Sequence, residues 1–294
     1  MIQQIFGIVF PLFALVLVGF FYGRYRTPDM AAANQMNMDL FIPALIFHVM
    51  SNKEFELAQY GDLAVAAMVV VLGSGLIAWP IARLFGYPVR TFIPPMMFSN
   101  SGNMGLPLAL FAFGEQALPA AVVLFIVENT LHFTLGMRMM DPRASLLAIF
   151  RVPMLLATLA GLLVGLLKIP LPQVLLVPIE MAGQVAIPLM LFSLGVRLTA
   201  VDLKDGRIGL VGALVCPGSG LLIAVLLQPV LQLAPDQFGM LLVFSVLPPA
   251  VLNFMIAERF GQEPHRVASI VMLGNLSSIV IIPLMLAVVL SRSG

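Results

Sequence analysis

Long apolar segments follow one another along almost the whole chain of 294 residues. Each is close to the roughly 20 residues that an α-helix needs to cross a bilayer. Overall, 61% of the residues are apolar and 10% are charged, whereas a soluble domain has roughly a quarter charged residues. This composition excludes a soluble globular protein, and the unbroken apolar runs exclude a membrane β-barrel. The sequence therefore predicts an all-α polytopic membrane protein with ten transmembrane helices, at about 4–22, 32–50, 63–83, 92–113, 117–137, 147–167, 173–196, 208–231, 237–257 and 266–290.

Basic residues are divided unevenly between the two sides of the predicted membrane. Twelve of the 15 Lys and Arg residues fall in one set of alternate loops, and the other set, with the termini, holds Lys53, Lys168 and Arg292. Because cytoplasmic loops carry the excess of Lys and Arg, we expect both termini outside, in a multi-pass protein of the cell inner membrane or plasma membrane. The net charge of +1 offers no basic surplus for nucleic acid. A single cysteine excludes a disulfide within the chain and a cysteine metal cluster, and no cofactor is expected.

Prolines recur in the same order in the two halves of the chain. Pro11 in the first segment corresponds to Pro153 in the sixth, and Pro43 in the second corresponds to Pro188 in the seventh. These correspondences indicate that a unit of five helices is duplicated. Because five is an odd number of crossings, the second copy must cross the membrane in the opposite direction to the first. Inverted repeats are typical of secondary transporters, which bind substrate near the midplane between the repeats. The predicted repeats cover residues 1–140 and 141–294.

The fourth and ninth segments are both interrupted at mid-depth. The fourth contains Ser-Asn-Ser-Gly-Asn-Met-Gly-Leu-Pro at 99–107, and the ninth contains two prolines followed by an asparagine. Such breaks survive in hydrocarbon only where they face protein or a water-filled cavity. Each break begins a half-helix whose free N–H groups favour an anion such as a carboxylate, and Asn103 is a candidate cap. The predicted substrate-binding residues are Asn100, Ser101, Gly102, Asn103, Pro248, Pro249 and Asn253.

Ionisable side chains inside predicted spans are candidates for coupling. Glu128 lies in the middle of the fifth segment, and His132, four residues later, shares its helix face. Two interpretations are open: Glu128 carries a proton, or it coordinates sodium together with amide carbonyls. Asp39 faces the same side as Gln35 nearer the cytoplasmic end, where a structural or gating role is equally open. The predicted coupling-ion residues are Glu128, Asn129, Asn275 and Asp39.

The motif at 99–107, together with Pro249 and the Ala-Glu-Arg-Phe-Gly segment at 257–261, resembles the auxin efflux carrier family. That family contains the plant PIN-formed carriers and bacterial permeases for malonate or malate. The resemblance covers the whole chain and implies that broken helices 4 and 9 cross. It also implies a transport domain of helices 3–5 and 8–10 that moves like an elevator against a scaffold of helices 1, 2, 6 and 7. Bacterial members usually have Thr or Ser where this chain has Ala250, and the short 138–151 connection is typical of a compact bacterial permease.

We therefore predict a secondary active transporter of a small organic anion, a mono- or dicarboxylate, that works by alternating access with proton coupling. The alternative is a sodium-coupled organic-anion symporter of bile-acid-symporter-like architecture. No HExxH, GxSxG or paired aspartate motif indicates an enzyme. Expected partners are the carboxylate, a proton or sodium, the lipid bilayer and a second copy of the chain in a homodimer, but not nucleic acid.

Overall fold

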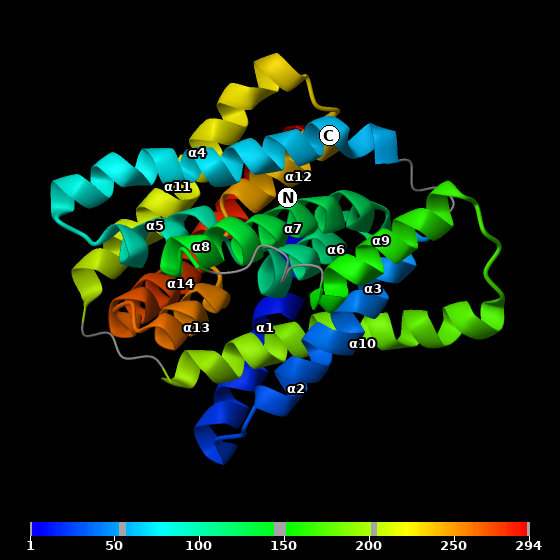
Figure 1. The fold of residues 1–294 in the computed structure, drawn as a ribbon, viewed down its shortest axis with the longest axis horizontal. Helices are drawn as coiled ribbons and strands as arrows, with labels where there is room; N and C mark the ends of the chain where they lie inside the picture. The colour runs from blue at the N-terminus through cyan, green and yellow to red at the C-terminus, as the bar shows by residue number, and fades with distance from the viewer. Residues whose placement is uncertain (1, 53–56, 144–150, 201–204, 293–294) are drawn as a thin grey trace.

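The structure is a computed structural model that describes residues 2–52, 57–143, 151–200 and 205–292, and these residues contain helices but no strand (Figure 1). Short helical turns are labelled η. In chain order the elements are α1 (Ile2–Arg26), α2 (Ala31–Met36), η1 (Asn37–Phe41), α3 (Ile42–Met50), η2 (Leu57–Tyr60), α4 (Gly61–Phe85), α5 (Val89–Met97), η3 (Ser101–Gly105), α6 (Leu106–Phe113), η4 (Glu115–Ala117), α7 (Leu118–Leu131), η5 (His132–Gly136), α8 (Met137–Met140), α9 (Pro153–Leu166), α10 (Gln173–Arg197), η7 (Leu198–Ala200), α11 (Gly206–Leu231), α12 (Pro235–Ser245), α13 (Val251–Phe260) and α14 (Pro264–Arg292).

Six helical stretches of the described residues are long and apolar enough to cross a membrane. They are α1, η2–α4, η4–α8, α10, α11 and α14, and the stretches η3–α6 and α9 are shorter but also apolar. The chain is therefore a multi-pass helical membrane protein, as the composition predicts. The count of ten crossings and the inverted sense of the second half stay predictions. Lys53 and the predicted start of the sixth segment at about residue 147 lie outside the described residues.

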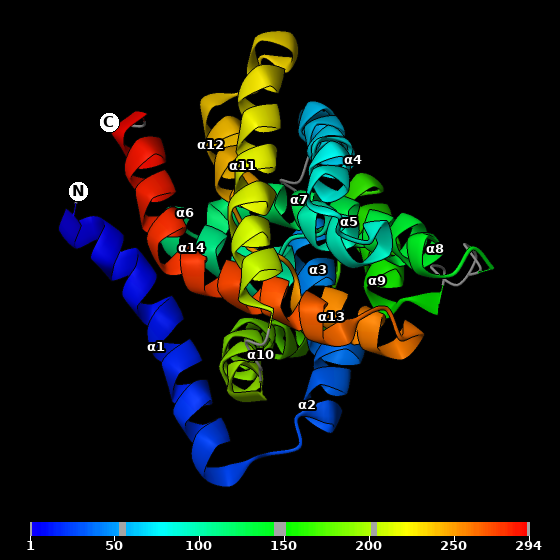
Figure 2. The ribbon, with the colours of Figure 1, turned by 90° about the vertical axis from the view of Figure 1, so that its left-hand side faces the viewer.

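The beginning of α1 and the end of α14 lie close together in both views, and Figure 2 shows them at one edge of the molecule (Figures 1 and 2). The opposite end of α1 carries Arg24 and Arg26. An even number of crossings places both ends of a chain on the same side of a membrane. The arrangement of α1 and α14 agrees with an even number, whereas the side on which they lie stays a prediction.

The long helices pack in two groups. In the first, α1 packs on α10, while α3 packs on both α9 and α10. In the second, α11 packs on α4 and α14, and α4 also packs on α5 and α7. Contacts between the groups are fewer and include those of α1 with α6, of α3 with α7 and of α10 with η3. The turn η3 contacts α10 of the first group and α7 of the second, and Met255 of α13 accepts a hydrogen bond from Arg197 of α10. Both η3 and α13 therefore lie where the two groups meet.

The backbones of α1 and α10 come unusually close in the first group. A Cβ atom added at Gly19 would overlap the carbonyl oxygen of Phe192, and one added at Gly195 would overlap that of Val16. Small residues let membrane helices approach until their backbones touch, which gains van der Waals contact. The absence of a side chain at Gly19 is thus required for the close packing of α1 on α10.

We expect Gly19→Val to lower the thermal unfolding temperature of the purified protein, because the backbone of α10 must move to admit the side chain. Overpacking of this kind costs about 1–3 kcal/mol. Gly7→Val on the same helix is the matched control, since a Cβ atom at Gly7 meets nothing within 4 Å. Equal unfolding temperatures for the two variants would contradict the close α1–α10 contact.

Candidate functional site

The breaks in the fourth and ninth predicted segments meet in the structure. Pro94 and Pro95 lie near the end of α5, which stops at Met97, while α12 stops at Ser245 before a Pro-Pro pair. Residues Ser99 and Pro249 pair in an antiparallel bridge. The Asn100 N–H donates to the Pro248 carbonyl at 2.7 Å, and the Ala250 N–H donates to the Phe98 carbonyl at 3.0 Å. Each break therefore provides hydrogen-bond partners for backbone groups of the other. Inside a membrane such groups need partners from the protein itself.

Three buried asparagines reinforce this crossing. The Asn253 side-chain amide donates to the carbonyls of Phe98 at 2.9 Å and Ala250 at 3.0 Å. The Asn275 amide donates to the Pro249 carbonyl at 3.2 Å, and its oxygen accepts from the Asn100 amide at 3.2 Å. All three asparagines are at least nine-tenths buried. Because a buried polar group without a partner is costly, losing any one of them destabilises the crossing.

A cavity of about 620 Å³ lies beside the crossing, between the two helix groups. Three π-helical turns contribute to its wall: η1, η3 and η5. Such turns are rare and occur frequently at functional sites. The turn η3 begins directly after the break, so its first N–H groups lack partners within the helix. Its cavity-lining residues are Ser101, Gly102 and Asn103.

The charged side chains around this cavity are mainly basic. Arg151, Arg197 and Arg259 line it, whereas Asp39 is the acidic residue in its wall. The Asp39 carboxylate accepts a hydrogen bond from Gln35 at 2.5 Å, which confirms the predicted common face of these two residues. Positive side chains and free N–H groups together make the cavity suitable for an anion.

His132 forms part of the same cavity wall. Its ring stacks on Phe98 with centroids 4.1 Å apart and an interplanar angle of 6°. One turn later, Gly136 leaves room for both rings, since a Cβ atom there would lie 2.8 Å from His132 and 2.9 Å from Phe98. The Nε2 atom of His132 and the Oδ1 atom of Asn253 are buried without a hydrogen-bond partner in the described part of the chain. His132 thus packs directly on the residue before the break.

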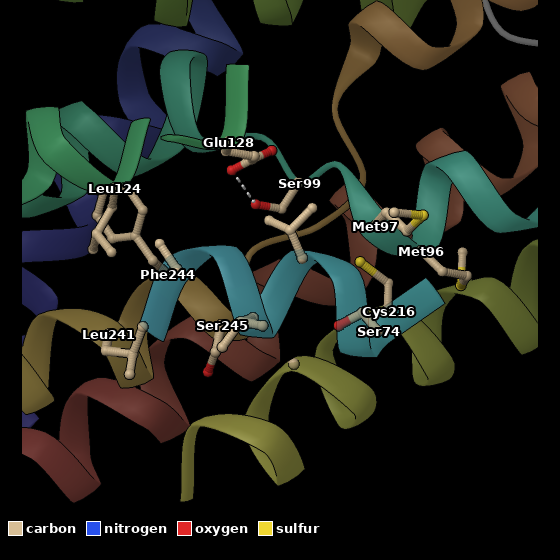
Figure 3. Close-up of a pocket in the computed structure, with 14 residues that line it drawn as sticks. Ser74, Met96, Met97, Ser99, Leu124, Glu128, Cys216, Leu241, Phe244 and Ser245 are labelled. Carbon is tan, nitrogen blue, oxygen red and sulfur yellow. Dashed lines mark hydrogen bonds between the residues drawn. The ribbon is translucent and has the colours of Figure 1, made fainter. Parts of the chain in front are cut away.

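Glu128 lies on the other side of the crossing, in a small cavity of about 40 Å³ (Figure 3). The Ser99 hydroxyl donates to its carboxyl oxygen at 3.0 Å, and the hydroxyl of Ser101 also hydrogen-bonds to it. Among the described residues, no cation interacts with this carboxyl group. The rest of the wall is apolar except for small polar and sulfur-containing side chains, namely Ser74, Met96, Met97, Cys216 and Ser245.

The two cavities separate residues that the sequence grouped together. Glu128 and His132 share a helix face but contribute to different cavities. Asn129 lines the larger cavity and donates its amide to the Phe125 carbonyl at 2.9 Å. Ser99 contributes to both cavities. A hydroxyl at the break itself therefore connects them.

The predicted substrate residues occupy two kinds of position. Four line the larger cavity: Asn100, Ser101, Gly102 and Asn103. The other three, Pro248, Pro249 and Asn253, build the crossing behind it. Of the predicted coupling residues, Asp39 and Asn129 line the larger cavity, whereas Glu128 and Asn275 do not.

Sequence reasoning missed part of the larger cavity. Asn34 and Asn37 line it from α2 and η1, and the three arginines line it from segments far apart in the chain. The sequence did contain a signal for the two asparagines, namely the amide-rich run Asn-Gln-Met-Asn at 34–37 inside an apolar segment. The arginines look like ordinary loop residues in the sequence, and only the fold brings them to one cavity.

Comparison with known proteins agrees with this site. A family model described as membrane transport protein matches twice, at residues 4–149 and 143–286. A relative named "Putative malonate transporter" from Rhizobium meliloti (strain 1021) is 27% identical over 303 residues, covering 94% of this chain and 93% of that protein. An uncharacterized transporter of Methanocaldococcus jannaschii is 23% identical over 94% of this chain and 96% of its own length, and one of Methanothermobacter thermautotrophicus is 27% identical over 94% and 95%. These relatives are transporters and not enzymes. The chain therefore belongs to the membrane transport protein family, the auxin efflux carrier family that its motif at 99–107 resembles.

Proposed function

We propose that the chain is a secondary active transporter of a small organic anion, a mono- or dicarboxylate, and that the anion binds in the 620 Å³ cavity. The observation that carries this proposal is the composition of the cavity wall. It combines the first N–H groups of η3 and two asparagines at the break with three arginines and one aspartate. This arrangement attracts a carboxylate by charge and orients it by hydrogen bonds.

A dicarboxylate of the size of malonate fits the wall best. The break offers neutral donors from Asn100 and Asn103, while Arg151 and Arg259 offer charged donors elsewhere in the same wall. Two separate groups of donors suit a ligand with two negative ends. The relative named for malonate supports the same chemical class.

Alternating access follows from where this cavity lies. One part of its wall comes from α2, η1 and α10, and the other from η3, α7, η5 and α13. The first set belongs to the scaffold that the family resemblance implies, and the second belongs to the transport domain. Elevator movement of one group past the other would carry the substrate between the two sides. The paired breaks and the doubled family match support the inverted repeats.

We assign the coupling role to a proton on Glu128, with sodium coupling as the alternative. Glu128 is 6% exposed and hydrogen-bonds to the hydroxyl of Ser99 at the break. The amides proposed for a sodium site are dispersed, because Asn129 lines the other cavity and Asn100 and Asn275 bond to each other. A lone carboxyl group with hydroxyl neighbours suits a proton better than a cation that needs several oxygen ligands.

The direct test is ligand-induced thermal stabilisation of the purified protein by malonate, its neutral diamide and a monocarboxylate, each with and without sodium. Malonate is expected to raise the unfolding temperature, since a ligand that binds only the folded state stabilises it, and the diamide is expected to leave it unchanged. Stabilisation by the diamide as strong as by malonate would contradict an anion site.

We further propose a homodimer, in the cell inner membrane or plasma membrane with both termini outside. Exposed apolar side chains cover the outer faces of the first helix group, including Phe6 on α1, Leu163 on α9 and Met181 on α10. A dimer through these faces would hold the scaffold still while the other group moves. Light scattering in mild detergent is expected to give twice the mass of the 31.7 kDa chain, and a monomer would contradict this expectation.

A further inference from the structure

A second, apolar cavity of about 330 Å³ lies beside the proposed substrate site, between the end of α10 and the helices α13 and α14. It shares Arg197, Val251 and Met255 with the larger cavity. Because α10 belongs to the first helix group and α14 to the second, this cavity lies between the two groups. In the proposed mechanism these groups move relative to each other.

The wall of this second cavity suits a hydrocarbon chain. Apart from Arg197 and His265, its lining side chains are apolar, and its volume is within the range of small-molecule sites. Two of its lining residues are partly exposed, Met255 at 44% and the His265 side chain at 58%, so the cavity is open and not sealed inside the protein. The apolar lining residues that belong to this cavity alone are Leu194, Leu198, Phe254, Ala268, Val271 and Met272.

Arg197 provides the charge at this cavity. Its guanidinium group donates to the thioether sulfur of Met255 at 2.9 Å, and it forms no ion pair with a carboxylate among the described residues. A thioether is a weak acceptor for a group with five N–H donors. The other basic group, His265, already contacts Asp205 at 3.4 Å. Because no carboxylate of the described residues pairs with it, the Arg197 guanidinium favours an anionic oxygen group such as a phosphate.

Arg197 and His265 both lie at helix ends, the first at the end of α10 and the second at the beginning of α14. Charged groups at helix ends with an apolar cleft beside them match the two parts of a phospholipid. Basic pockets between membrane helices bind anionic lipid headgroups in this way.

We propose that this cavity binds one acyl chain of an anionic phospholipid, whose phosphate is held by Arg197. The bound lipid fills the space between α10 and the α13–α14 pair, so it braces the two helix groups against each other. Arg197 lines both cavities, so the wall of the proposed substrate site keeps Arg151 and Arg259 when Arg197 holds the lipid, and the lipid site does not depend on which anion is transported.

The test uses native mass spectrometry of the purified full chain with phosphatidylglycerol and phosphatidylcholine of equal chain length. Wild-type protein is expected to retain phosphatidylglycerol about tenfold more strongly than phosphatidylcholine: both lipids carry the phosphate, but the quaternary ammonium of phosphatidylcholine offsets the phosphate charge and repels Arg197. Ala268→Trp, which fills the apolar cavity without touching the larger one, is expected to lose this retention. Val280→Trp is the matched control, since Val280 lies on the same helix and is 61% exposed outside the cavity.

Equal retention of the two lipids by wild-type protein would overturn the proposal, and this comparison needs no variant. Equal retention of phosphatidylglycerol by Ala268→Trp and wild type would also overturn it. Displacement of the lipid by malonate would assign the apolar cavity to the transported anion instead. Failure of malonate to stabilise the protein would contradict the proposed function while leaving the lipid result unaffected.

Discussion

Asn103→Ala is expected to weaken malonate binding by about 10- to 100-fold, the loss of one hydrogen bond to a charged group. Asn103 lies in the π-helical turn after the break, lines the larger cavity and hydrogen-bonds to no other described residue. Its amide is therefore available to a ligand. The measurement is a malonate titration of the purified variant by calorimetry, at one pH and one salt concentration.

The same substitution should leave the unfolding temperature of the ligand-free protein unchanged, because no internal hydrogen bond is lost. Asn253→Ala provides the contrast. Its amide donates to two carbonyl groups of the crossing, so its removal should lower stability by about 1–3 kcal/mol.

Asn100→Ala is expected to combine the two effects, because Asn100 both lines the larger cavity and bonds to Asn275. Unchanged malonate affinity in the Asn103 and Asn100 variants would move the substrate site away from the break. Loss of stability in the Asn103 variant would instead show that its amide has a structural partner.

The sequence predicted the helical membrane architecture from composition alone. Burying a charged side chain in hydrocarbon is so costly that membrane-spanning segments contain very few charged residues. It also located both breaks, since a Pro-Pro pair and a run of Ser, Asn and Gly cannot continue a lipid-facing helix. The helix limits agree closely for long segments: α10 spans Gln173–Arg197, against the predicted 173–196. Local patterns of this kind depend on residues close together in the chain.

The contacts across the crossing were less accessible from the sequence. The sequence grouped Asn275 with Glu128 as a coupling-ion residue, whereas in the structure Asn275 bonds to Asn100 and to the Pro249 carbonyl. The rotation of a helix about its axis decides which carbonyl group a side-chain amide can reach. One turn of altered pitch changes that rotation. Three π-helical turns occur around the larger cavity, and no simple residue pattern predicts such turns.

The separation of Glu128 from the larger cavity has the same origin. Glu128 and His132, four residues apart on one helix face, line different cavities because residues from other parts of the chain complete each cavity. Arg151, Arg197 and Arg259 meet at one cavity only because distant segments pack together. Long-range packing of this kind cannot be read from a single sequence.

Glu128 has the position expected of a group that couples a proton to transport. A carboxylate buried without a cation is far more costly than the neutral acid, so gain or loss of one proton changes the energy of the crossing. The change reaches the break directly, because the Ser99 hydroxyl bonds to Glu128 and Ser99 also lines the larger cavity. The proposed protonation of Glu128 and the proposed substrate binding would thus act on the same short segment.

Glu128→Gln is expected to fix the neutral state. Proteoliposomes containing this variant should still exchange labelled malonate for unlabelled malonate, because exchange needs no net proton movement. They should not accumulate malonate in response to a pH gradient. For one coupled proton and a membrane potential held at zero, a gradient of one pH unit supports at most about tenfold accumulation, and the variant should show none.

The control is Glu180→Gln, which also removes a carboxyl group from a predicted span. Glu180 lies on α10, is exposed and bonds to Gln184 at 3.3 Å, away from both cavities. This variant should accumulate malonate as wild type does. Wild-type accumulation that follows an imposed sodium gradient and ignores a pH gradient would refute proton coupling. Loss of exchange as well as accumulation in Glu128→Gln would show that the carboxylate form is needed for movement itself, so that Glu128 would not be a coupling group alone.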